Sequence, residues 1–147
     1  KIGAILGGAA PKDAELLYQL GIRMGLAFQL QDDLLDVYGD PAVFGKKIGG
    51  DILCNKKTFM LITALERANA EQKAELVDWI GKSEFVPEEK IKAVTAIYDE
   101  IGIASVCTEK IEELYAEGMT LLEQVELPDE RKNNLREFAY RLMGRRL

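Results

Sequence analysis

The sequence predicts an all-α protein, and three features lead to this fold class. Apolar residues recur at helical spacing over several long stretches. These stretches begin at a proline followed by acidic residues or at an asparagine, and they end at glycine, which are start and stop signals of helices. No stretch alternates apolar and polar residues as a half-buried strand does. We therefore expect a single all-α domain.

The helices are expected in the following order. The longest runs over about 12–38, between Pro11 and a stop at Gly39, and a glycine-rich loop follows over about 39–55. Further helices are expected at about 57–68, 70–80 and 87–100, from a break at Gly102 to about 125, and at about 128–143. Residues 1–10 carry no helix cap and no initiating Met, and they resemble the tail of an upstream helix. We therefore expect residues 1–147 to be a domain fragment of a longer protein.

Composition and charge exclude several classes of function. The 147 residues are 48% hydrophobic and 30% charged, which is typical of a folded, soluble domain. With 19 basic and 25 acidic residues the net charge is −6, which argues against a nucleic-acid partner. The chain has no histidine, so Ser-His-Asp catalysis and histidine-ligated zinc chemistry are excluded. Any chemistry must use carboxylates, lysines, arginines and metals that prefer oxygen ligands.

The cysteine content and the hydropathy pattern bear on location. Cys54 and Cys107 are far apart in sequence and form no CxxC motif, so we expect two reduced thiols in a cytoplasmic protein. The apolar run at residues 1–10 is too short to span a bilayer, so no transmembrane segment is expected.

An acidic stripe lies on the longest predicted helix. Gln29, Asp32, Asp33 and Asp36 fall within an arc of roughly 100°, while the rest of this helix is largely apolar and therefore expected to be buried. Two carboxylates one helical turn apart repel by about 3 kcal/mol, and no basic residue on this face relieves the repulsion. All-oxygen ligands favour Mg²⁺ or Mn²⁺, and their helical spacing does not fit an EF-hand. The alternative is an acidic face exposed to solvent.

The glycine-rich loop supplies the opposite charge. Lys46 and Lys47 follow Gly45, and Lys56 and Lys57 follow Asn55. The spacing does not match a Walker A loop, and an ordinary solvated lysine-rich loop is the alternative interpretation. Next to a metal-binding helix, however, metal and lysines together are suited to hold a diphosphate.

These residues resemble a known motif. The sequence resembles the second aspartate-rich region of trans-isoprenyl diphosphate synthases (the polyprenyl synthetase family) in Phe28-Gln29-x-x-Asp32-Asp33-x-x-Asp36-x-x-Gly39-Asp40-x-x-x-x-Gly45-Lys46, then Gly49-x-Asp51 and Lys56. The later helices resemble the C-terminal part of the same family. The resemblance thus covers the whole chain and implies the C-terminal part of an isoprenoid-synthase helical bundle.

The resemblance also implies an activity and a site. A Mg²⁺-bound allylic diphosphate would ionise, and isopentenyl diphosphate would attack the resulting cation. By this resemblance Asp32 would bind the metal directly, and Asp33 and Asp36 partly through water, with Asp51 supporting them. Lys46 and Lys56 would hold the allylic diphosphate, with Lys47 as a competitor for the role of Lys46. Gln29 would line the reacting end, and Phe28 would also belong to the substrate-binding residues.

Two departures and two alternatives accompany the resemblance. The first aspartate-rich motif of the family and its upstream arginines are not in this sequence, so we expect the chain alone to be inactive. A terpene cyclase, or a non-catalytic helical subunit or interaction module of the same fold, would share much of the pattern. The apolar face around Gly21, Gly25 and Phe28 is expected to lack partners, which predicts either a homo-oligomer or a missing upstream half that covers this face.

Overall fold

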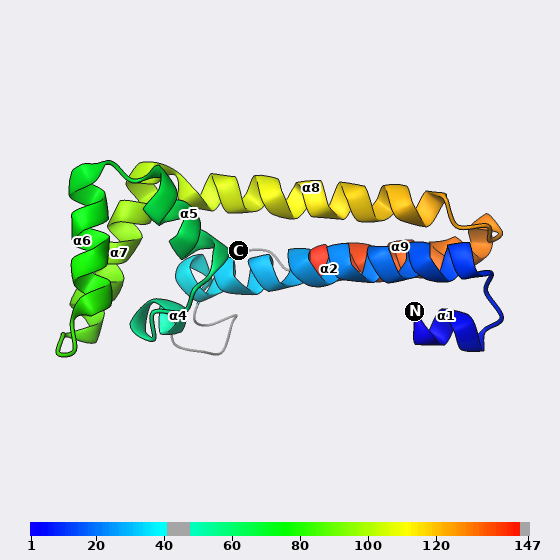
Figure 1. Cartoon of the computed structure of the whole chain (residues 1–147), viewed down its shortest axis with the longest axis horizontal. Coiled ribbons are helices and arrows are strands. Elements are labelled where there is room, and N and C mark those ends of the chain that lie inside the picture. The colour runs from blue at the N-terminus through cyan, green and yellow to red at the C-terminus, as the bar shows by residue number, and fades with distance from the viewer. Residues whose placement is uncertain (41–47, 145–147) are drawn as a thin grey trace. The chain divides into compact units, whose positions relative to one another are not determined.

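The structure, a computed structural model, describes residues 1–40 and 48–144 (Figure 1). The regular structure of these residues is entirely helical, so the all-α prediction is confirmed. The helices are α1 (Ile2–Leu6), α2 (Pro11–Tyr38), α4 (Gly50–Leu53), α5 (Phe59–Arg67), α6 (Ala70–Gly81), α7 (Pro87–Ile101), α8 (Ile103–Glu123) and α9 (Asp129–Met143).

Local signals account for the helix ends. Asn69 and Gln72 form a capping box at the start of α6, with the Asn69 side chain accepting from the Gln72 amide. Pro87 occupies the first turn of α7, where its missing N–H leaves no helical hydrogen bond unmade. Gly102 ends α7 with φ +75°, a conformation that favours glycine. These ends lie within one or two residues of those expected from the sequence.

Two differences appear around the glycine-rich loop. The short helix α4 lies where only loop was expected, and it begins after Gly49, whose φ is +83°. A Cβ on Gly49 would also lie 2.7 Å from Ile91, so glycine is needed there for two reasons. Helix α5 begins at Phe59 because the Thr58 hydroxyl accepts a hydrogen bond from the Leu61 amide at 3.1 Å.

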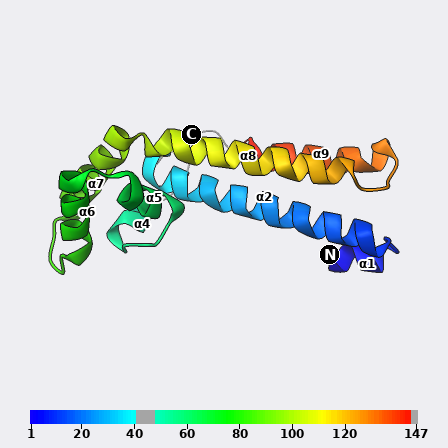
Figure 2. The ribbon, with the colours of Figure 1, turned by 45° about the horizontal axis from the view of Figure 1, so that its top comes forward.

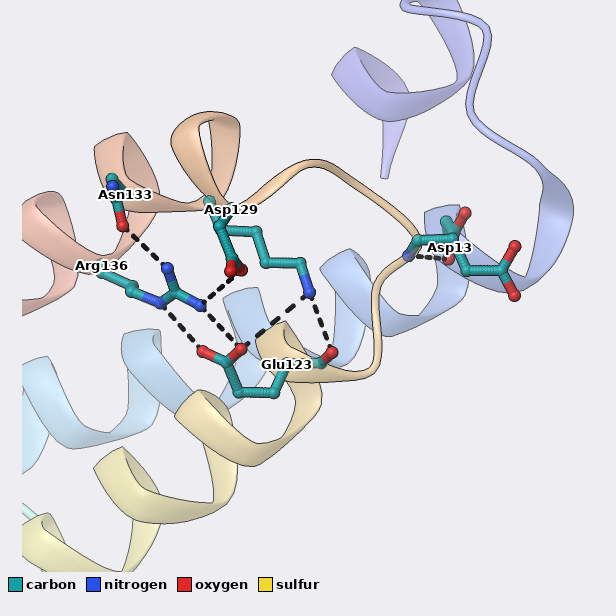
Figure 3. A network of polar contacts seen from close by, with 7 residues as sticks. Asp13, Glu123, Asp129, Asn133 and Arg136 are labelled. Carbon is teal, nitrogen blue, oxygen red and sulfur yellow. Dashed lines mark hydrogen bonds and ion pairs between the residues drawn. The ribbon is translucent and has the colours of Figure 1, made fainter.

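The chain divides into two compact units. The first contains Lys1–Gln29 and the described residues from Glu109 onward, and its buried centre is formed by Leu20, Met24, Leu122 and Ala139. A Cβ added to Gly118 would collide with the Met24 side chain, so α8 approaches α2 closely at this point. Figure 3 shows a polar cluster of the same unit, in which Arg136 binds Glu123 and Asp129.

The second unit is Leu30–Thr108 and is organised around α7. Helices α4, α5 and α6 all pack against α7, and α6 runs alongside it in both views (Figures 1 and 2). The buried face of α7 carries Val94, Ile97 and Tyr98, at the spacing of one helical stripe. The end of α2, residues 30–38, belongs to this unit and carries the acidic stripe.

Candidate functional site

The acidic stripe lies in a densely packed part of α2. Asp33 is 5% exposed, Leu34 and Leu35 are buried beside it, and Asp32 and Asp36 are partly buried. Burial of this part of the helix is therefore confirmed, and an acidic face open to solvent is contradicted. Earlier on α2, Leu26 is 51% exposed and a Cβ on Gly25 would meet no described atom within 4 Å, in line with the expectation that the apolar face around Gly21, Gly25 and Phe28 lacks partners.

One lysine joins two carboxylates that come from different elements. The Nζ of Lys56 donates to Asp33 Oδ1 and to Asp51 Oδ2, each at 2.8 Å. The Asp33 carboxylate is 6% exposed, whereas the Lys56 side chain is 44% exposed. The hydrogen bonds to Asp33 and then to Asp51 raise the pKa of Lys56. A lysine outside the helix therefore neutralises the Asp33 carboxylate of the stripe, and helical spacing alone did not reveal this partner.

The third acid of the stripe fixes α4 against α2. Asp36 Oδ2 accepts a hydrogen bond from the Asp51 amide at 2.9 Å, and the Gly49 amide donates to the Asp36 carbonyl oxygen at 2.6 Å. A Cβ on Gly50 would lie 3.3 Å from Asp36 Oδ1. Burial raises the pKa of Asp36, and the Asp51 amide opposes this effect. Asp36 thus holds the backbone that carries Asp51.

A small cavity adjoins the lysine and its two acids. Its volume is about 20 Å³, enough for about one water molecule. Its polar lining comes from Asp33, Asp51, Lys56, Asn55, Thr58 and Lys90, and its apolar lining includes Leu76, Trp79 and Val94. The cavity therefore joins the acidic stripe to the packed face of α7.

The other predicted site residues are placed as follows. Lys46 and Lys47 lie outside the described residues. Phe28, partly buried, and Gln29, exposed, belong to the first unit, so their predicted contact with substrate stays a prediction. Within residues 1–40 and 48–144, no three acidic or cysteine side chains are grouped so as to hold a metal. The predicted metal role of Asp32, with that of the other acids, also stays a prediction.

Sequence reasoning missed two polar residues beside the site. Asn55 binds the Ile80 carbonyl and the Lys90 ammonium through its side chain, and Lys90 is only 1% exposed. A signal was present for Lys90, because it precedes Val94 by one turn and so continues the apolar stripe of α7. A charged residue at such a position needs a polar partner.

Comparison with known proteins identifies the family. The sequence profile described as polyprenyl synthetase matches residues 1–100. The chain belongs to the polyprenyl synthetase family. Among its relatives in this family, human farnesyl pyrophosphate synthase is 40% identical over 107 residues, which are 73% of this chain and 25% of the human protein. A short chain isoprenyl diphosphate synthase of Methanothermobacter thermautotrophicus is 37% identical over 102 residues, 69% of this chain and 30% of that protein.

Solved structures of the polyprenyl synthetase family share the fold. A geranylgeranyl pyrophosphate synthase matches with a TM-score of 0.86 and 37% identity, over 99% of this chain and 45% of that one. The enzyme from Corynebacterium glutamicum, complexed with isoprenyl diphosphate and magnesium, matches with a TM-score of 0.84 and 36% identity over 98% and 41% of the two chains. The present chain spans about a quarter to a third of the length of the curated relatives named above.

Two further observations bear on the other predictions. The structure has Cys54 exposed and Cys107 buried, both as free thiols, as expected. None of the helices in the described residues combines the length and the apolar character needed to cross a bilayer.

Proposed function

We propose that this chain forms part of a trans-prenyltransferase, an enzyme that condenses an allylic diphosphate with isopentenyl diphosphate. The observation that carries the proposal is the convergence of Asp33 and Asp51 on a single cation. The names of the relatives, which are prenyl diphosphate synthases, support this activity over a terpene cyclase or a non-catalytic subunit.

The acids fit a magnesium ion. Carboxylate oxygens of Asp33 and Asp51 both contact the Lys56 ammonium, so the two carboxylates converge on one point that a metal ion could occupy instead. Mg²⁺ in proteins commonly uses one or two carboxylates and completes its octahedron with water and substrate phosphates, so a group of three acids is not required. Mn²⁺ has the same ligand preference. When bound, the metal would neutralise the diphosphate and assist its departure as the allylic C–O bond ionises.

In this proposal the Lys56 ammonium leaves the carboxylates of Asp33 and Asp51 and binds the diphosphate instead. A divalent ion between Asp33 and Asp51 repels the ammonium that now lies there, and the flexible lysine stem lets that ammonium move to a diphosphate oxygen. Metal and diphosphate would then bind together, because the diphosphate offers Lys56 a new partner.

The remaining predicted residues complete the site. Lys46 and Lys47 would bind the diphosphate, and Phe28 and Gln29 would lie along the reacting end of the allylic chain. Asp32 would bind the metal directly, and Asp36 would bind it partly through water. The resemblance to trans-isoprenyl diphosphate synthases implies that the proton lost after condensation leaves with the released diphosphate. The expected homo-oligomer and the cytoplasmic location remain predictions.

Binding of geranyl diphosphate tests the proposal. Isothermal titration calorimetry should detect binding that requires Mg²⁺, and Asp33→Asn should abolish it. Asp78→Asn is the matched control, because Asp78 forms only an exposed ion pair with Lys82 in the same unit. Binding that is independent of Mg²⁺, or that survives Asp33→Asn, would contradict the proposal. The chain alone should not condense geranyl diphosphate with isopentenyl diphosphate, which a product assay checks.

A further inference from the structure

Lys90 is a buried cation that the proposed chemistry does not use. It lies on α7 with 1% of its surface exposed. Its Nζ donates to Asn55 Oδ1 at 2.7 Å and lies 4.2 Å from the centre of the Phe85 ring. Burial lowers the pKa of Lys90, which indicates that its charge is held at a cost in solvation. An apolar residue of similar length would fill the same space without this cost.

The partner of Lys90 is a residue with an unusual backbone conformation. Asn55 has φ +53°, in the left-handed region that asparagine tolerates better than most residues. Both polar atoms of its side chain are bound, since Oδ1 accepts from Lys90 and Nδ2 donates to the Ile80 carbonyl at 3.1 Å. Asn55 is thus attached to α7 and to the end of α6 at once.

The next residue along the chain is Lys56. Its backbone amide donates to the Asp51 carbonyl at 3.0 Å, and its carbonyl accepts from the Thr58 amide at 2.8 Å. Its ammonium reaches Asp33 and Asp51 at 2.8 Å. A lysine side chain has a flexible four-carbon stem, so the range of positions that its ammonium can reach depends on where its backbone is held.

We propose that Lys90 is a positioning residue that acts through Asn55. Its ammonium holds the Asn55 side chain, Asn55 fixes the connection between α4 and α5, and this connection sets the position from which Lys56 reaches the two acids. The role of this arrangement in catalysis rests on the proposed function. The contacts from Lys90 through Asn55 to Lys56 are independent of that proposal.

The test measures the acetylation rate of the Lys56 amine by acetic anhydride, followed by mass spectrometry, in the absence of metal and diphosphate. Lys90→Met should raise this rate about fivefold. Loss of about one hydrogen bond should increase by this factor the fraction of molecules in which the Lys56 ammonium has left Asp33 and Asp51. Lys92→Met, which removes an exposed lysine two positions further along α7, should leave the rate unchanged. Thermal unfolding of each variant shows that it is folded.

A double-mutant cycle separates positioning from simple packing. Asn55→Gly keeps the left-handed backbone accessible and removes the side chain, so it should raise the Lys56 rate as Lys90→Met does. The double variant should be no faster than either single variant, because both changes break one chain of contacts. Additive effects, or an unchanged rate in folded Lys90→Met, would overturn the inference. If Lys90→Met does not fold, an unchanged rate in Asn55→Gly overturns it.

The outcome is independent of the proposed function. Failure of Mg²⁺-dependent diphosphate binding would remove the prenyltransferase proposal and leave the acetylation result standing. An unchanged acetylation rate would remove the role of Lys90 and leave diphosphate binding as it is. If both hold, Lys90→Met should also weaken Mg²⁺-dependent binding of geranyl diphosphate, and Lys92→Met should not.

Discussion

Each unit of the molecule holds one basic side chain bound to two carboxylates, and the two clusters differ in burial. In the first unit Arg136 binds Glu123 with both ends of its fork, at 2.9 and 2.7 Å, and reaches Asp129 at 3.4 Å (Figure 3). The two acids are 52% and 83% exposed. Water solvates these charges whether or not the arginine is present, so the cluster contributes little beyond local order.

In the second unit Lys56 binds Asp33 and Asp51, whose side chains are only 6% and 21% exposed. Here the acids cannot rely on water and need a cation beside them. The cation is a lysine, a single point of charge on a flexible stem, rather than the planar fork of an arginine. In the proposed function the buried acids and Lys56 form a binding site, whereas the Arg136 cluster is an exposed group of ion pairs.

The largest expected difference between the clusters is in ligand binding. Asp51→Asn should weaken Mg²⁺-dependent binding of geranyl diphosphate by about 10- to 100-fold, as is typical for loss of a group that supports a metal. Asp129→Asn removes the corresponding acid of the exposed cluster and should change the affinity less than twofold. Calorimetric titration of both variants measures the contrast, and equal losses would show that the clusters do not differ in function.

Stability should also separate the two cations. Lys56→Met removes the ammonium that binds the buried Asp33 carboxylate and should lower the free energy of unfolding by about 2 kcal/mol, a value reduced for the exposure of Lys56. Arg136→Met should cost about 0.5–1 kcal/mol. Urea unfolding monitored by circular dichroism measures both.

Magnesium sharpens this second comparison. Added Mg²⁺ should restore part of the stability lost in Lys56→Met, because the ion can take the place of the ammonium, and it should not restore Arg136→Met. Restoration of both variants to the same extent would indicate a general salt effect instead.

The pH dependence of stability should have opposite signs in the two units. Burial raises the pKa of Asp36, so its contribution to stability is present at low pH and is lost as the pH rises from the unfolded value, near 4, through the folded pKa. The Tm of Asp36→Asn relative to that of the wild type should therefore rise between pH 4 and pH 7.

Glu15 of the first unit provides the contrast. Hydrogen bonds from Gln19 and then Lys1 lower its pKa, so its contribution is present above the unfolded value and is lost as the pH falls through the folded pKa. Glu15→Gln should therefore become less stable relative to wild type as the pH rises from 4 to 7. Thermal unfolding at several pH values measures both trends, and trends of the same sign would contradict the assignment.

The smallest effect concerns the two thiols of the second unit. Cys54 is exposed, whereas Cys107 is fully buried and burial raises its pKa to about 11. A thiol reagent at pH 8 should therefore modify one cysteine rapidly in the folded protein and both after unfolding. Rapid modification of both in the folded protein would mean that the unit opens readily.

The helices were predictable because their signals are local. Pro11, Asn69, Pro87 and Gly102 act within one turn of their own positions, and the expected boundaries followed from them. Helix α4 was not predicted because four residues that include a glycine show no periodicity. The burial of Asp33 was predictable for the same reason as the helices, since its apolar neighbours lie on the same helix.

The arrangement around Lys56 was only partly predictable. Helical spacing relates residues of one helix, so it could not show that Lys56, 23 positions from Asp33, relieves the charge of the stripe. The motif resemblance assigned Lys56 to the site but not to these acids. The role of Asn55 depends on contacts with α6 and α7, and contacts between distant segments leave no periodic trace in the sequence.

The division of the chain into units has a consequence for its synthesis on the ribosome. Among the described residues, the second unit is one continuous segment, Leu30–Thr108, and this segment is synthesised before the residues that complete the first unit. The first unit joins segments from both sides of this stretch, and its Asp13 carboxylate meets the Glu126 amide 113 residues later. Leu20 and Met24 must therefore wait for Leu122 and Ala139, whereas the residues of the second unit have by then all been synthesised. During that interval Leu20 and Met24 lack the two partners that pack against them in the folded first unit.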